Sequence, residues 1–259
     1  MTTVATRGFT VIELMLFLAI TGAIFAALMI GVNNNIIQQQ YKGSVQEYGY
    51  LLQNQYSEVA NTRNGRDVNL QCKLDAAGDV AVSSPTGGGD LPGAPSVIPA
   101  CVVLGRAIEV GPGGASVHVY PVVGLEPASG SSLSDLDALI AYKPNITDQF
   151  ETISTDLNYG TSLKLPGGNV SEASFLILRS PSSGLIRVFA SSNPLSVTST
   201  NPLKADIISM ITLDNATMSV KNCVDGQRGL LPRQSVMIDP KVAGADGVVI
   251  NENDPECRS

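Results

Sequence analysis

The feature that most constrains this chain is the apolar run from Phe9 to Val32, FTVIELMLFLAITGAIFAALMIGV. The run contains no Pro, and Glu13 is its only ionisable side chain. At about 1.5 Å per residue, a helix of this length reaches roughly 36 Å and can cross a hydrocarbon core of roughly 30 Å with some tilt. The run therefore predicts a membrane-spanning helix.

Glu13 distinguishes this run from a plain membrane anchor. A charged side chain inside a bilayer costs roughly 2.5–3.5 kcal/mol on insertion scales. We expect no partner for the carboxylate within its own helix, so the partner would come from another subunit. A single-pass anchor that tolerates a glutamate is the alternative.

The order of residues before the run narrows the interpretation. Residues 1–8, MTTVATRG, end in Arg7 and Gly8. A secretory signal peptide has its apolar run before the cleavage site, whereas here the small Gly8 precedes the run. Arg7-Gly8 followed by FTVIEL and a long apolar segment closely resembles the type IV prepilin class, which comprises type IV pilins, minor pilins and type II secretion pseudopilins. The resemblance covers residues 7 to about 32.

The resemblance implies a processing step and an assembly role. A prepilin peptidase would cut between Gly8 and Phe9 and methylate the new amine of Phe9. Glu13 would then set register by meeting the Phe9 amine of a neighbouring subunit, since stranding one partner of a buried ion pair costs about 3–5 kcal/mol. The implied partners are other pilin subunits, major and minor, the prepilin peptidase, the pilus assembly platform with its ATPase, and inner-membrane lipid.

Four cysteines follow the apolar run, at positions 72, 101, 223 and 257. Arg7 favours a cytoplasmic N-terminus, which sends the rest of the chain to an oxidising compartment. Of the three possible connectivities we favour Cys72–Cys101 and Cys223–Cys257, because each closes a loop of about 30 residues, worth roughly 3–4 kcal/mol in the chain-entropy model. The segment from Cys223 to Cys257 also resembles the disulfide-bounded C-terminal loop of pilins. The expected location is the bacterial cytoplasmic membrane and then a filament at the cell surface.

Beyond the membrane span, an apolar stripe predicts that the helix continues to about Arg63. The stripe residues are spaced by three or four positions, which places them on one helical face. They are Ile37, Tyr41, Val45, Tyr48, Leu52, Tyr56 and Val59. Asn64-Gly65 would end the helix.

The remainder predicts strands and loops, giving an α+β fold in which a long N-terminal helix packs on an antiparallel β-sheet head. A helix is expected at 134–143 with Ser134 as its N-cap, and residues 205–213 fit a helix or a strand. The expected strands are 68–74, 79–83, 101–110, 115–123, 174–179, 185–190, 216–223 and 234–239. The expected divisions are a leader at 1–8, a transmembrane and polymerisation helix at 9–32, its amphipathic continuation at 33–63 and the head at 64–259. The loops at 84–99 and 224–256 are the first places to look for partner contacts.

Few residues suggest chemistry in the head. His118 is the only histidine, so a triad or a zinc site is not expected, and no nucleophile–base pattern predicts an enzyme or a cofactor. Asp246, Glu252 and Asp254 lie in an acidic tail whose oxygen density suits calcium, but the spacing matches no EF-hand and a solvated tail is favoured. The formal net charge is −7 with basic residues scattered singly, so direct nucleic-acid binding is not expected.

These observations predict a structural protein, a subunit of a type IV pilus-like filament. A minor pilin is favoured because the head is large and carries four cysteines. The alternatives are a type II secretion pseudopilin and a membrane-tethered ligand-binding or adhesive domain that does not polymerise.

Overall fold

The structure is a computed structural model in which two compact units, 1–43 and 44–259, can be distinguished. The described residues are 10–61, 71–74, 78, 80–83, 101–127, 134–147, 152–167, 169, 174–191, 195, 203–226, 233–242 and 244–257. The predicted cleavage residues Gly8 and Phe9, the predicted helix end at Asn64-Gly65 and the predicted loop at 84–99 lie outside these ranges.

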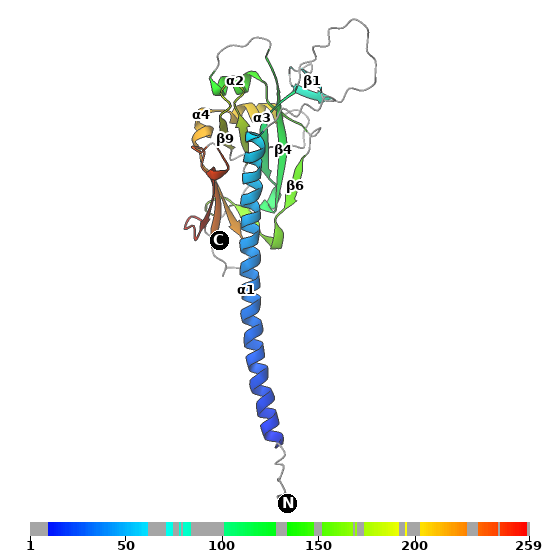
Figure 1. Cartoon of the computed structure of the whole chain (residues 1–259), viewed down its shortest axis with the longest axis vertical. Helices are drawn as coiled ribbons and strands as arrows, with labels where there is room; N and C mark the ends of the chain where they lie inside the picture. The colour runs from blue at the N-terminus through cyan, green and yellow to red at the C-terminus, as the bar shows by residue number, and fades with distance from the viewer. Residues whose placement is uncertain are drawn as a thin grey trace, which may run out of the picture. The chain divides into compact units, whose positions relative to one another are not determined.

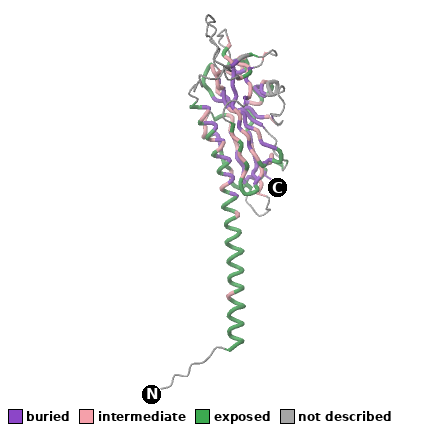
Figure 2. Tube along the Cα trace, turned by 90° about the vertical axis from the view of Figure 1, so that its right-hand side faces the viewer, coloured by how far each residue is buried: buried purple, intermediate pink, exposed green. Residues whose placement is uncertain are grey.

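The long helix α1 runs from Val11 to Ala60 without interruption (Figure 1). Its residues up to Gly43 belong to the first unit, and its last turns, from Ser44, belong to the second. The N-terminal half is exposed except at Thr21, which is half-buried, whereas buried positions alternate with exposed ones toward the C-terminal end (Figure 2).

The C-terminal turns of α1 form part of the core of the second unit. The stripe residues Val45, Tyr48, Leu52, Tyr56 and Val59 are all buried, which confirms the pattern expected for this half of the helix. Burial of one large apolar side chain stabilises a fold by roughly 1.5–3 kcal/mol. These five side chains therefore supply much of the free energy that holds the C-terminal turns of α1 in the second unit.

Polar contacts fix the same turns against several strands. The Asn222 side-chain amide donates to the Tyr48 hydroxyl over 2.7 Å, and the hydroxyls of Ser44 and Thr161 lie 2.6 Å apart. On another side, Arg106 forms an ion pair with Glu58 at 2.9 Å. Helix α1 therefore contacts both larger sheets of the second unit.

The described strands form three antiparallel sheets. The largest has the order β5-β4-β3-β8-β9 with β6 also paired to β4, the second has the order β12-β11-β10-β7, and the third is the hairpin β1-β2. The strands are β1 (Gln71–Leu74), β2 (Val80–Ser83), β3 (Cys101–Val110), β4 (Ser116–Leu125), β5 (Asn145–Ile146), β6 (Ile153–Asp156), β7 (Ser162–Lys164), β8 (Ser174–Arg179), β9 (Ile186–Ser191), β10 (Val220–Asp225), β11 (Gln234–Ile238) and β12 (Val248–Glu252). The α+β fold class expected from the sequence is confirmed.

Short helices cover one face of the largest sheet. They are α2 (Asp135–Ala141), α3 (Leu203–Met210) and α4 (Leu213–Thr217), and single-turn 3-10 helices occur at Pro112–Gly114, Asn158–Gly160 and Ala245–Gly247. Side chains such as Leu139, Ile207 and Ala216 join Leu176 and Phe189 of the sheet in one buried cluster. This cluster is the core on the face that these helices cover.

Several local predictions are confirmed and others are wrong. The hairpins β1-β2, β3-β4 and β8-β9 form where expected, and Ser134 caps α2 by accepting from the Asp137 backbone amide. Residues 213–217 are helical, although a strand was expected from 216, because Thr212 caps a short helix there. The expected loop at 224–256 contains β12, whose Val-Val-Ile sequence pairs with β11.

One glycine is required by the close approach of two strands. A bulge interrupts the pairing of β3 with β4 between Val103 and Gly105. Gly105 has φ +159°, and a Cβ built there would lie 2.0 Å from the Ile177 carbonyl oxygen. Only glycine fits this position, since any side chain would collide with the backbone of β8.

Candidate functional site

The candidate assembly segment is the N-terminal part of α1, from Val11 to Val32. It is long and apolar enough to cross a membrane, and none of its most apolar window is buried within the structure. The large apolar side chains that are more than half exposed in this segment are Val11, Ile12, Leu14, Met15, Leu16, Phe17, Leu18, Ile20, Ile24, Phe25, Leu28, Met29, Ile30 and Val32. A helix that is apolar all round belongs in lipid or inside an assembly.

Glu13 has hydrogen-bond donors within its own segment. The backbone amide and the hydroxyl of Thr10 both donate to Glu13 Oε2 over 2.9 Å, and the Glu13 amide contacts the Thr10 hydroxyl at 3.3 Å. This reciprocal arrangement is a capping box, in which a Thr before the helix and a Glu three residues later satisfy each other's backbone amides. The expectation that the helix offers Glu13 no partner is therefore wrong. The T-x-x-E spacing of Thr10 and Glu13 is the sequence signal of this cap.

The capping leaves Glu13 able to bind a second partner. Both hydrogen bonds from Thr10 end on Oε2, and an ionised carboxylate can accept further bonds on its other oxygen. The other polar side chain near the middle of the segment, Thr21, donates its hydroxyl to the Phe17 carbonyl over 2.8 Å. The carboxylate is therefore the strongest polar group that the described part of this segment presents.

Two disulfides are present in the second unit. They join Cys72 to Cys101 and Cys223 to Cys257, which confirms the two pairings predicted from the loop lengths. The first ties the hairpin β1-β2 to the start of β3, and the second ties β10 to the C-terminal end of the chain. Cysteine pairs of this kind persist in oxidising compartments.

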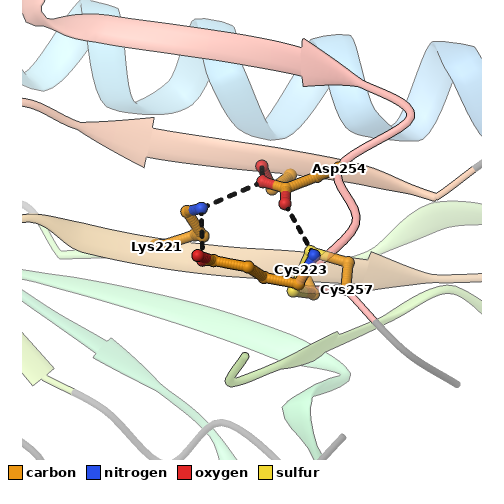
Figure 3. Close-up of a disulfide and its surroundings, with 6 residues drawn as sticks. Lys221, Cys223, Asp254 and Cys257 are labelled. Carbon is orange, nitrogen blue, oxygen red and sulfur yellow. Dashed lines mark hydrogen bonds and ion pairs between the residues drawn. A yellow bond between two sulfur atoms is a disulfide. The ribbon is translucent and has the colours of Figure 1, made fainter. Parts of the chain in front are cut away.

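An ion-pair network lies beside the second disulfide (Figure 3). Lys221 Nζ lies 3.1 Å from Asp254 and 2.6 Å from Glu256, while the Ser235 hydroxyl donates to Asp254 over 2.6 Å. The Ser235 hydroxyl, the Glu256 amide and Lys221 together lower the pKa of Asp254, and the contact with Glu256 is the main reason that the pKa of Lys221 is raised. The network anchors the C-terminal segment on β10 and β11.

The three calcium candidates do not converge. Asp254 is 5% exposed and bound by Lys221, Asp246 lies in the 3-10 helix before β12, and Glu252 ends β12. Among the described residues, no group of three or more His, Cys, Asp or Glu side chains could hold a metal ion. The expectation of a solvated acidic tail is wrong for Asp254, because hydrogen bonds and Lys221 offset the cost of its burial.

His118 lies on β4 as expected, but it is only half-exposed. Its Nδ1 lies 3.0 Å from the Ser154 hydroxyl, and its Nε2 lies 3.3 Å from the Ser116 hydroxyl. Both ring nitrogens thus face hydroxyls rather than carboxylates, unlike the histidine of a serine-hydrolase triad.

Comparisons of the chain with protein-family models, with curated proteins and with solved structures found no match.

Proposed function

We propose that this chain is a structural subunit of a type IV pilus-like filament, with a minor pilin as the favoured role. The observation that carries the proposal is the apolar surface of Val11–Val32, which is exposed on all sides of α1. It begins two residues after Phe9 of the Arg7-Gly8-Phe9 sequence that resembles a prepilin processing site. A soluble protein gains nothing from such a surface, whereas a subunit that moves from lipid into a filament core needs it in both places.

The membrane stage sets the orientation. Arg7 stays on the cytoplasmic side, the Val11–Val32 part of α1 spans the bilayer, and the second unit with its two disulfides lies in an oxidising compartment. The prepilin peptidase then cuts after Gly8 and methylates the amine of Phe9. The products are an eight-residue leader and a mature chain that begins with the apolar helix.

The assembly stage uses Glu13. In the separate subunit the carboxylate caps its own helix through Thr10. In the filament the Phe9 amine of a neighbouring subunit approaches the carboxylate, and the two charges neutralise each other in an apolar core. Pairing at this one position fixes the register of otherwise featureless apolar helices. The assembly platform and its ATPase supply the extraction from lipid.

Two substitutions of Glu13 test this role. Glu13→Val removes both the charge and the cap, whereas Glu13→Gln keeps an oxygen for Thr10 and removes only the charge. We expect both variants to be processed normally at Gly8 and to be missing from sheared filaments, as measured by mass spectrometry and immunoblotting. Normal incorporation of Glu13→Gln would refute the charge pairing.

A substitution at Gly8 tests the processing step separately. Glycine is the small residue that the peptidase would accept at the cleavage site, so Gly8→Leu should leave a precursor that is larger by the first eight residues. Intact mass measurement of the membrane-extracted chain detects this difference. If the unsubstituted chain also retains residues 1–8 in the cell, the proposed class is wrong and the chain is a tethered domain.

A further inference from the structure

A row of polar side chains crosses the largest sheet from one edge to the other. Ser154 of β6 is paired with His118 of β4, His118 with Glu109 of β3, Glu109 with Ser174 of β8, and Ser174 with Ser191 of β9. Residues that are paired across strands point to the same face of a sheet. These five residues, which we call the polar row, therefore form a continuous line of hydroxyl, imidazole and carboxyl groups.

The polar row borders the apolar core of the same face. The next row along the strands consists of Tyr120, Ala107, Leu176 and Phe189. Ala107, Leu176 and Phe189 are buried in the cluster that includes side chains of α2, α3 and α4, and Tyr120 packs at its edge. The change from an apolar to a polar row marks where the side chains on this face of the sheet no longer belong to the buried core.

The exposure of the polar row changes along its length. Ser154 is exposed, His118 and Glu109 are half-buried, and Ser174 is buried. The row is thus exposed at Ser154, most buried at Ser174 and half-buried again at Ser191, with Glu109 and His118 partly accessible. This gradient suits a ligand that enters from the β6 edge.

The central groups are held in place by contacts within the sheet. Serine hydroxyls face both ring nitrogens of His118, at 3.0 and 3.3 Å, and hydroxyls can accept or donate in either tautomer. The rings of His118 and Tyr120 have centroids 6.3 Å apart and planes 26° from parallel. Gly111 leaves room for this arrangement, since a Cβ there would lie 2.2 Å from Ser116 Oγ and 3.3 Å from His118 Nε2.

Glu109 is retained in this place at a cost to folding. Burial raises the pKa of Glu109 to about 6, although a hydrogen bond with Tyr120 acts in the opposite direction. At neutral pH Glu109 is therefore ionised in a place where burial disfavours its charge. A charge kept under such conditions in a partly accessible position is a candidate for ligand binding.

The chemistry of the row selects the class of ligand. None of its five residues is Lys or Arg, and Glu109 repels anions, so phosphates and nucleic acids are disfavoured. Glu109 accepts from the Tyr120 hydroxyl, the serines can donate and accept, and the rings of His118 and of Tyr120 in the next row offer apolar contact. These groups fit a ligand with many hydroxyl groups.

We propose that the polar row binds a saccharide unit, with Glu109 accepting hydrogen bonds from two of its hydroxyls and Ser154 contacting it at the exposed end. His118 and Tyr120 contact the carbon face of the sugar ring. This proposal concerns the second unit alone and does not depend on filament assembly.

The single histidine makes the test specific. In the full chain labelled with ¹³C-histidine, the ring Cε1–H group of His118 gives one NMR signal inside the proposed site. The protein is held in a detergent without a sugar headgroup, because an alkyl maltoside would itself be a ligand. The probes are glucose, galactose, mannose and N-acetylglucosamine, added singly at neutral pH, with tetramethylammonium as a cationic comparison.

We expect at least one of these sugars to shift the His118 signal saturably, with a Kd of roughly millimolar order. Glu109→Gln should weaken that binding about tenfold, because it removes the charge from the accepting group. Ser154→Ala, at an exposed position, should weaken it about threefold. Glu252→Gln removes a carboxylate from the other sheet and should leave the Kd unchanged.

Three results would overturn the proposal. The first is that none of the four sugars shifts the His118 signal. The second is that tetramethylammonium binds while the sugars do not, which would assign the row to cations. The third is that Glu109→Gln and Ser154→Ala, each with unchanged thermal unfolding, bind the sugar as tightly as the natural chain. All three are independent of whether the chain enters filaments.

Discussion

The two ends of α1 carry their apolar side chains in different ways. From Val11 to Val32 the apolar residues cover every side of the helix and remain exposed, while from Ser44 to Ala60 they form one stripe that is buried in the second unit. Both segments belong to one uninterrupted helix, so the difference lies in the side chains rather than in the backbone. The comparison teaches that a stripe is satisfied within one chain, whereas an all-round apolar surface needs lipid or other subunits.

The largest effect should come from shortening one side chain of the buried stripe. Leu52→Ala should lower the free energy of unfolding of the second unit by about 2–5 kcal/mol, because it leaves a cavity at a fully buried position. Leu18→Ala, in the exposed segment, should leave that free energy unchanged. Chemical denaturation monitored by near-ultraviolet circular dichroism measures both. Equal losses in the two variants would contradict the division of roles along the helix.

A charge in the exposed segment should impair membrane insertion rather than the stability of the second unit. Ile20→Lys places an ammonium near the centre of the apolar run and should make membrane insertion less favourable by about 3 kcal/mol. Gln39→Lys, beyond that run, should insert normally. The measurement is the fraction of chain that resists carbonate extraction from membranes. If Ile20→Lys inserts as well as Gln39→Lys, the segment does not span the bilayer.

Acid should weaken the second unit through its paired carboxyls. Hydrogen bonds from Ser183 and Ser180, with the nearby Arg187, lower the pKa of Asp135 to about 2, and the pKa of Asp254 is also lowered. A group whose folded-state pKa is depressed stabilises the fold above its ordinary pKa near 4 and loses that contribution as pH falls toward about 2.

Thermal unfolding of the second unit between pH 5 and pH 2 measures this loss. We expect the midpoint to fall over that range, and to fall less in Asp135→Asn, which starts lower and has no carboxyl to protonate. An identical pH dependence in the natural chain and in Asp135→Asn would rule out Asp135 as a source of the acid sensitivity.

The smallest effects concern the helix glycines. A Cβ at Gly49 would lie 2.9 Å from Ile250 Cδ1, whereas a Cβ at Gly43 meets nothing within 4 Å. Gly43→Ala should therefore gain up to about 1 kcal/mol of helix propensity, and Gly49→Ala should gain less because Ile250 must shift. Denaturant midpoints compare the two variants. A larger gain at Gly49 would mean that the contact with Ile250 carries no cost.

The second unit shows which signals in a sequence are local. The N-cap of α2 at Ser134 and the hairpins β3-β4 and β8-β9 were predictable because turns and strand patterns lie within short stretches. Strand β12 is not evident from the sequence because Asn251 and Glu252 follow its Val-Val-Ile residues, and only pairing with β11 reveals it. The two-residue strand β5 has no pattern of its own and forms by pairing with β4.

The candidate sites also differ in how far the sequence alone predicts them. The special position of Glu13 was evident from a single carboxylate in an apolar run, but its capping by Thr10 was missed, although the T-x-x-E spacing was present. The polar row could not be predicted from sequence, because its five residues lie on five strands between positions 109 and 191. From the sequence, only His118 can be singled out, and the residues that surround it in the fold cannot.

By itself, the sequence determined that this chain has an apolar helix with one carboxylate near its start, an amphipathic continuation and a β-rich remainder, because hydrophobic periodicity and composition act over neighbouring residues. The tertiary structure alone decided the division of the described strands into three sheets, the burial of Asp254 beside Lys221 and the alignment of Glu109 with His118. These depend on strand register, which brings together residues that are distant in the chain and is set by packing of the whole unit.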